Sequence, residues 1–249
     1  MTTSLFDPAW VGVEGVFGGF VLGRIVDAAD ADDGFAPQAV TVHFVSLVRA
    51  GEADLRVETL HRGRATASRR IELRQDGRLR AHAVVSLVPT VQEPLWEPSA
   101  DPTPWGDPES CPPAPWHGGL PFSALFEVRA LGDRTRDGGL AAWVRMRAGM
   151  SLGPHAAASV FLDLLPPAPL AMDPPAFFVP TTDFTVHFAP SYENVRTGWH
   201  VVTHRTVWAS REACVDESAV YDRGGRLLAQ LRQGRAIRWP SSHGRGLPV

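Results

Sequence analysis

The sequence predicts an α+β protein built from two similar units, each a helix followed by an antiparallel sheet. Thr41-Val42-His43-Phe44 recurs letter for letter at Thr185–Phe188, a spacing of 185 − 41 = 144 residues. Strand-like runs follow each copy and end in hairpin turns at Gly77 and Gly225, which are 225 − 77 = 148 residues apart. Two markers with nearly equal spacing indicate an internal duplication. We expect the two sheets to join edge to edge into one continuous sheet, because pairing covers strand edges that would otherwise be exposed.

The first unit is expected over residues 1–90. A helix is predicted from Val16 to Ala29, where apolar residues recur at helical spacing. Gly18, Gly19 and Gly23 interrupt it, each at a cost of about 1 kcal/mol relative to alanine, so another element is expected to pack closely against this backbone. Alternating runs separated by glycine-containing turns then predict four antiparallel strands, at residues 40–48, 53–60, 65–74 and 79–88.

A linker is expected over residues 91–120, and the second unit over 121–249. The linker region is rich in proline and contains Trp96, Trp105 and Trp116, which favours a segment that lies against the protein body. The second unit begins with strands at about 122–131 and 140–148. A helix follows between Pro154 and Pro166-Pro167, since proline suits a first helical position and also stops a helix. Further strands are predicted at 181–188, 199–209, 212–221 and 227–238.

Composition restricts the possible partners. The chain has 249 residues, a formal net charge of −3 and 44% hydrophobic residues. A mildly acidic protein has no general attraction for nucleic acid or for an anionic membrane, and neither a secretion signal nor a membrane span is evident, so we expect a cytoplasmic protein. Cys111 and Cys214 have no metal-binding or redox spacing. We therefore expect no metal and no cofactor.

Three positions are candidates for chemistry. Asp163 lies among leucines and Phe161 at the end of the second predicted helix, where a buried carboxylate must be paired or shifted in pKa; the alternative is a solvent-facing residue on the last turn. Strand alternation places Thr181, Asp183, Thr185 and His187 on one polar face. Gln233 stands where the first unit has Val85, since 233 − 148 = 85, and either faces solvent or has a function.

Several short motifs, in their order and spacing, resemble the double-hotdog acyl-CoA thioesterases of the thioesterase II type and the related thioesterase-like superfamily. The resemblance covers most of residues 13–90 and 122–238. In the first unit it rests on Val16-Phe17-Gly18-Gly19, Arg49-Ala50-Gly51, Gly63, Ser68-Arg69-Arg70 and Gln75-Asp76-Gly77. Ala50 departs from the proline of the family pattern. A double hotdog fold is therefore expected.

The resemblance implies hydrolysis of an acyl-CoA or acyl-carrier thioester to a carboxylic acid and a free thiol. By similarity, Asp163, Thr181 and Gln233 hold the attacking water, with Thr182 as the neighbouring alternative to Thr181. Gly18 and Gly19 are expected to bind the substrate and its oxyanion through the backbone. Association into homo-oligomers is also plausible for such a chain. Two alternatives remain: a hotdog protein that binds an acyl thioester or acyl carrier without cleaving it, and a hydratase or dehydratase that uses Asp183 with His187.

Overall fold

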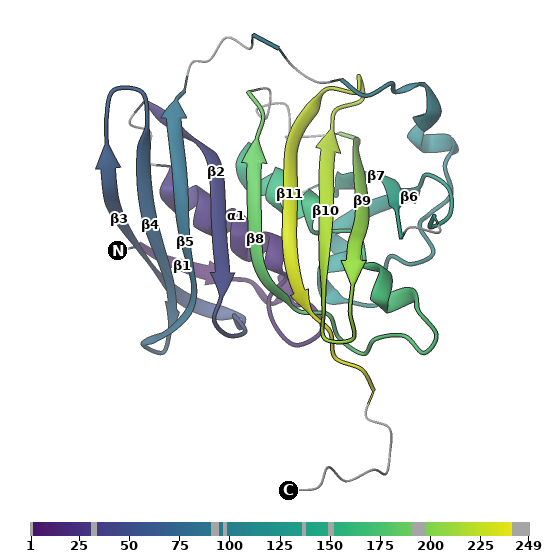
Figure 1. The fold of residues 1–249 in the computed structure, drawn as a ribbon, viewed down its shortest axis with the longest axis horizontal. Helices are drawn as coiled ribbons and strands as arrows, with labels where there is room; N and C mark the ends of the chain where they lie inside the picture. Colours follow the sequence, from purple (N-terminus) through teal and green to yellow (C-terminus); the bar gives the residue numbers. More distant parts are fainter. Residues whose placement is uncertain are drawn as a thin grey trace, which may run out of the picture.

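The molecule is one antiparallel sheet with both long helices on the same face (Figure 1). The computed structural model describes residues 2–30, 34–90, 95–96, 99–135, 138–148, 152–190 and 198–240. Within these residues the sheet has 11 strands in the order β1-β3-β4-β5-β2-β8-β11-β10-β9-β7-β6. All the neighbouring pairs are antiparallel. The strands of the first unit form one half of the sheet, and those of the second unit form the other.

In the described residues the two α-helices and eleven strands have the following bounds, and five short 3-10 helices lie between them. The first unit contains β1 (Thr2–Phe6), α1 (Gly18–Ala29), β2 (Phe35–Phe44), β3 (Gly51–Arg62), β4 (Ala67–Gln75) and β5 (Arg78–Pro89). The second contains β6 (Phe126–Ala130), β7 (Leu140–Met146), α2 (Pro154–Leu162), β8 (Thr181–Phe188), β9 (His200–Ala209), β10 (Ala213–Tyr221) and β11 (Leu227–Ala236). The predicted elements are all present, while β1 was not expected. It pairs with β3 at the outer edge of the sheet, with Ser4 opposite Ala53.

The two halves meet where β2 pairs with β8. Thr41 lies opposite Thr185 in this pair, and their hydroxyl oxygens are 3.3 Å apart. The repeated tetrapeptide therefore marks the centre of the sheet, where each unit contributes the same residues from opposite directions. The prediction of a double hotdog with one continuous sheet is confirmed.

The helices pack against each other at very short range. A Cβ added to Gly23 of α1 would lie 3.0 Å from the Cβ of Ala156 and 3.1 Å from its Cα, both in α2. Only glycine lets the backbones approach so closely, which explains a residue that is otherwise unfavourable inside a helix. Val21, Leu22 and Ile25 are fully buried in a core that continues through both units. The helices thus join the two halves on one side while β2 and β8 join them on the other.

Part of the segment between the units lies against the second half. The indole Nε1 of Trp143 in β7 donates to the carbonyl of Trp105 at 3.1 Å, and the Trp105 ring contacts Tyr221 of β10. Trp116 packs against the main core, whereas Trp96 is exposed. Residues 91–94 and 97–98 lie outside the described part of the chain. Trp105 and Trp116 therefore lie against the protein body, as the composition predicted, and Trp96 does not.

We predict that Gly23→Leu destabilises the fold, because a larger side chain would force α1 and α2 apart. Overpacking of this kind costs about 1–3 kcal/mol, and for a chain of this size each kcal/mol lowers Tm by about 2–4 °C. Thermal unfolding followed by circular dichroism measures the change. Gly224→Leu, in an exposed turn, is the control and should leave Tm nearly unchanged. An unchanged Tm for Gly23→Leu would show that the helix contact tolerates expansion.

Candidate active site

Asp163 follows the last residue of α2 and is its C-cap, with a carboxylate buried between the two helices and the sheet. Its Oδ2 accepts a 2.9 Å hydrogen bond from the backbone N–H of Gly19 at the start of α1. Its Oδ1 accepts from the Gln233 amide at 3.2 Å and from the Arg235 guanidinium at 2.9 Å. The residue is 7% exposed, so it is not the solvent-facing residue of the alternative interpretation. One carboxylate thus connects α1, α2 and β11.

Thr181 lies at the start of β8 and faces the helices. The strand register shifts beside it: Gly234 of β11 pairs with Asp183, but the next residue, Arg235, pairs with Thr181. The irregularity leaves Thr182 as an extra residue and turns Thr181 away from the face of Asp183, Thr185 and His187. The prediction that all four share a face is therefore wrong for Thr181. The bulge brings the Thr181 hydroxyl to the buried polar residues.

Gln233 lies on the inner face of β11 and is 1% exposed. Its Nε2 donates to Asp163 Oδ1 and, at 3.0 Å, to Thr181 Oγ1, so both amide hydrogens are used. An ionised carboxylate only accepts hydrogen bonds, which fixes the amide with its nitrogen toward Asp163. The buried Oε1 has no partner among the residues that the structure describes. An acceptor is therefore left for a further O–H donor.

Arg235, two residues along the same strand face, completes the cluster. The guanidinium NH2 donates to Asp163, Nε donates to Asp216 Oδ2 at 2.6 Å, and NH1 donates to Thr181 Oγ1 and to the carbonyl of Val179, both at 3.3 Å. Asp216, in β10, is 0% exposed and accepts on its other oxygen from Thr206 Oγ1 at 2.7 Å. The cluster therefore consists of two buried carboxylates bridged by one arginine.

The surroundings of Asp163 raise its pKa above that of an exposed aspartate. Burial raises the pKa of Asp163, while the charge of Arg235 and the hydrogen bonds from Gln233 and Gly19 oppose the rise. Burial lowers the pKa of Arg235, but the charges of Asp163 and Asp216 more than offset this and leave it raised. The arginine therefore stays protonated. A raised pKa at Asp163 is the property that a proton acceptor near neutral pH requires.

A cavity of about 460 Å³ opens beside this cluster. Its wall includes Asp163, Thr181 and Arg235. Gln233 forms hydrogen bonds to Asp163 and Thr181. The rest of the lining is mainly apolar and includes Val16, Phe17, Phe44, Leu47, Trp116, Phe122, Leu165, Leu170 and Phe177. An apolar cavity with a few convergent polar groups at one wall is the usual form of a small-molecule site.

Gly18 lines the cavity next to the carboxylate, and Gly19, the following residue of α1, is buried against it. A Cβ on Gly18 would lie 3.0 Å from Asp163 Oδ2, and one on Gly19 would lie 2.9 Å from the Ser159 carbonyl oxygen. The Gly19 N–H is directed at Asp163, which differs from the expected oxyanion-binding role and makes Gly19 a support of the carboxylate. Gly18 lines the cavity as the first residue of α1, where backbone N–H groups have no intrahelical partner.

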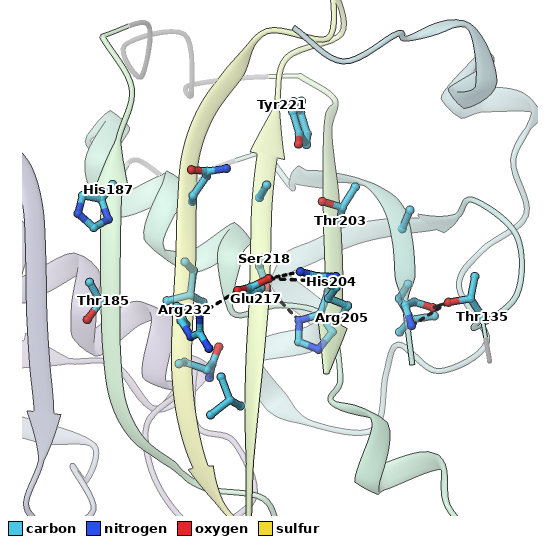
Figure 2. Close-up of a pocket in the computed structure, with 18 of the residues that line it drawn as sticks. Thr135, Thr185, His187, Thr203, His204, Arg205, Glu217, Ser218, Tyr221 and Arg232 are labelled. Carbon is cyan, nitrogen blue, oxygen red and sulfur yellow. Dashed lines mark hydrogen bonds and ion pairs between the residues drawn. The ribbon is translucent and has the colours of Figure 1, made fainter. Parts of the chain in front are cut away.

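Asp183 and His187 lie on the opposite face of the sheet. They border a separate hollow of about 1030 Å³ on the second half, where His187 and Thr185 project from β8 and Arg205, Glu217 and Arg232 form ion pairs (Figure 2). Asp183 accepts from Thr182 Oγ1 at 2.9 Å. The rival acid–base pair is therefore separated from the apolar cavity by the sheet.

Two members of the buried cluster, Arg235 and Asp216, were not expected from the sequence. A signal was available: Arg235 is two residues after Gln233 and must share its face, while Asp216 interrupts an alternating strand at an inward position. Among the described residues, no group of three or more His, Cys, Asp or Glu is placed to hold a metal ion. Among those same residues, no helix has the length and apolarity to cross a membrane.

The fold and the cavity together define a hotdog protein of double length with a buried polar cluster at the wall of an apolar cavity. Comparison with known families agrees: the N-terminal domain of acyl-CoA thioesterases matches residues 6–88, and the C-terminal domain matches residues 108–235. The chain belongs to this acyl-CoA thioesterase family. No curated protein sequence matches the chain.

Solved structures with the same fold come from several bacteria. A hot dog protein of unknown function from Alicyclobacillus acidocaldarius is 20% identical, with a TM-score of 0.83 over 96% of this chain and 93% of that one. A thioesterase II candidate from Thermobifida fusca YX is 20% identical, with a TM-score of 0.79 over 94% and 91%. The tesB protein of Mycobacterium avium subs paratuberculosis is 16% identical, with a TM-score of 0.73 over 94% and 91%. At these identities the similarity shows the fold.

His204, a buried histidine beside the cluster, is expected to lower the stability of the fold in acid. His204 bonds through Nδ1 to Ser218 Oγ at 2.9 Å (Figure 2), and burial lowers its pKa from 6.5 to about 4. In the unfolded chain the imidazole gains its proton near pH 6.5, so between that pH and about 4 the unfolded state binds more protons. This part of the stability is present above pH 6.5 and is lost as the pH falls toward 4.

His204→Gln should therefore unfold with a shallower pH dependence than the wild type over this window. Urea unfolding at several pH values measures the slope. His43→Gln, at an exposed position, is the control and should keep the wild-type slope. Equal slopes for wild type and His204→Gln would contradict a neutral, buried His204.

Proposed function

We propose that the protein hydrolyses acyl-CoA thioesters by direct attack of a water molecule held by Asp163, Thr181 and Gln233. One observation carries the proposal: a single amide nitrogen of Gln233 bonds to both Asp163 and Thr181 at the wall of an apolar cavity. The three side chains come from different elements, and the bulge at Thr182 is what brings Thr181 to the other two.

The hydrogen-bonding capacity of the three groups matches one water molecule. Thr181 Oγ1 already accepts from Gln233 and Arg235, so its own hydrogen is free to be donated to the water oxygen. Among the residues that the structure describes, Asp163 Oδ2 has one partner, Gly19, and Gln233 Oε1 has none, so each can accept one water hydrogen. The second lone pair of the water is then left for attack.

The reaction follows from this arrangement. The water oxygen attacks the thioester carbonyl carbon as its proton passes to Asp163 Oδ2, and the carbonyl oxygen gains the negative charge. The backbone N–H of Gly18, at the N-terminus of α1, stabilises that charge together with the positive end of the helix dipole. The C–S bond then breaks, the thiolate takes the proton from Asp163, and the carboxylic acid and free thiol leave. The apolar lining accommodates the acyl group.

Asp163→Asn should lower thiol release by about 10²–10⁴-fold, because it keeps the size of the side chain but removes the proton acceptor. The assay follows free thiol from acetyl-, hexanoyl-, decanoyl- and palmitoyl-CoA. The chain offers a matched control: Asp27 lies nine residues after the first residue of α1, as Asp163 does after the first of α2 (27 − 18 = 163 − 154 = 9), but pairs with Arg24. Asp27→Asn should retain activity.

Gln233→Ala and Thr181→Ala should each lower kcat, and each should add little to Asp163→Asn, since groups that act on one water behave as a unit. Full activity in a folded Asp163→Asn protein would remove Asp163 from the mechanism. Acyl-CoA binding with no thiol release from any member of the panel in the wild type would instead favour the non-hydrolysing binding protein.

A further inference from the structure

The structure assigns Arg235 a role in the reaction proposed above: we propose that it is a positioning residue that keeps Asp163 ionised and oriented, and that Asp216 in turn fixes Arg235. This inference rests on the proposed function, because it concerns the state of the residue that accepts the proton. It goes beyond the three water-holding groups to the buried charges behind them.

The first step concerns the charge of Asp163. The side chain is 4% exposed, and removal from water favours the neutral acid, which cannot accept a proton. Gly19 and Gln233 donate to the carboxylate, but both are uncharged. The Arg235 guanidinium at 2.9 Å is the cation bonded to it within the described residues. Arg235 is therefore the group that most directly favours the ionised form.

The second step concerns direction. The Arg235 bond and the Gln233 bond both fall on Oδ1, whereas within the described part of the chain Oδ2 accepts only from the Gly19 N–H. Two donors on one oxygen and one on the other fix the rotation of the carboxylate and leave capacity on Oδ2, the oxygen beside Gly18. Arg235 also donates to Thr181, so it contacts two of the three groups assigned to the water.

The third step explains Asp216. An arginine buried to 8% exposure between a carboxylate and a hydroxyl can adopt several rotamers unless another group fixes it. Asp216 bonds to Nε at 2.6 Å and is itself held by Thr206. His204 Nε2 lies 3.9 Å from Asp216 Oδ1, and Arg134 and the Cys214 thiol also act on this carboxylate electrostatically. Among these charged and titratable neighbours of Asp216, counted together with Arg235, only Arg235 forms an ion pair with it at hydrogen-bonding distance.

Recognition of an anionic substrate is the other role that a buried arginine at a cavity could have. All three nitrogens of Arg235 already donate to protein acceptors, on Asp163, Asp216, Thr181 and the Val179 carbonyl. These bonds use four of the five guanidinium N–H groups, so no pair of them is left to bind a substrate carboxylate or phosphate in a bidentate manner. The geometry therefore favours a role that acts through Asp163.

The repeat supplies an internal comparison. Arg235 corresponds to Leu87 of the first unit, as 235 − 148 = 87, and Gln233 corresponds to Val85; both counterparts are fully buried and apolar. Asp27, at the helix position equivalent to Asp163, pairs instead with Arg24 on its own helix. At these two positions of the last strand, the arginine and glutamine thus occur in the unit that carries Asp163, which is expected if they serve that residue.

The test is the pH dependence of kcat/KM for decanoyl-CoA hydrolysis, in which the acidic limb reports the ionisation of Asp163. Arg235→Met combined with Asp216→Asn removes the arginine without leaving a charged Asp216 buried and unpaired, so that Asp163 is the carboxylate that loses its cation. The acidic limb of this double variant should move to higher pH by about one to three units. Asp216→Asn alone leaves the arginine without its second carboxylate, and its limb should move to lower pH. Arg232→Met, on the exposed face of the same strand, is the matched control and should leave the limb in place.

The proposal is supported if the acidic limb moves to higher pH in the double variant and to lower pH in Asp216→Asn. It is overturned if the limb of a folded double variant does not move. A rise in KM with no change of the limb would indicate substrate recognition and would also overturn it. Infrared titration of the carboxyl band, taken as the difference between each protein and its Asp163→Asn form, gives the same ionisation without turnover. If the wild type cleaved no thioester, the proposed function would fail, while this titration would still show whether Arg235 controls Asp163.

Discussion

The hydrogen bond from the Gly19 N–H to the Asp163 carboxylate connects the two units at the point where chemistry is proposed. It requires the N-terminus of α1 to lie against the C-terminus of α2, and that contact is possible because Gly18, Gly19 and Gly23 carry no side chain. The sheet imposes the same arrangement from the other side, through the pairing of β2 with β8. A change in either contact would displace the carboxylate from the threonine and glutamine on the sheet.

The two units share an architecture but not a site. In the first, residues 30–34 connect the helix to the next strand; in the second, residues 163–180 do so. The longer connection supplies Leu164, Leu165, Leu170, Phe177 and Phe178 to the cavity wall. Buried charges are costly to place in a core, and an apolar core of similar volume is often as stable or more so. The first unit also buries an arginine, Arg69 of β4, which donates to the Ala29 carbonyl, but the two carboxylates bridged by one arginine belong to the second unit. That cluster is therefore better explained by function than by stability.

Much of the fold followed from the sequence, because the repeated tetrapeptide and the paired turns fix the units whatever the details of packing. Asp163 and Gln233 could be selected because each is polar at an apolar position, although their roles came from the family resemblance. The inward position of Thr181 could not be predicted, since period-two alternation cannot anticipate a register shift at Thr182. Arg235 was missed because arginine in a strand normally faces solvent, and its burial depends on carboxylates from two other elements.

In the proposed mechanism Asp163 acts on water and does not itself attack the thioester. A single turnover with enzyme in excess is run in water labelled with heavy oxygen and analysed by mass spectrometry of both product and protein. It distinguishes direct attack by water from an acyl-aspartate intermediate that water opens at the aspartyl carbon. Direct attack by water predicts labelled carboxylic acid from the first turnover and no label in the peptide that contains Asp163. Unlabelled acid in the first turnover, with the label found in Asp163, would show an acyl-aspartate intermediate and contradict the account.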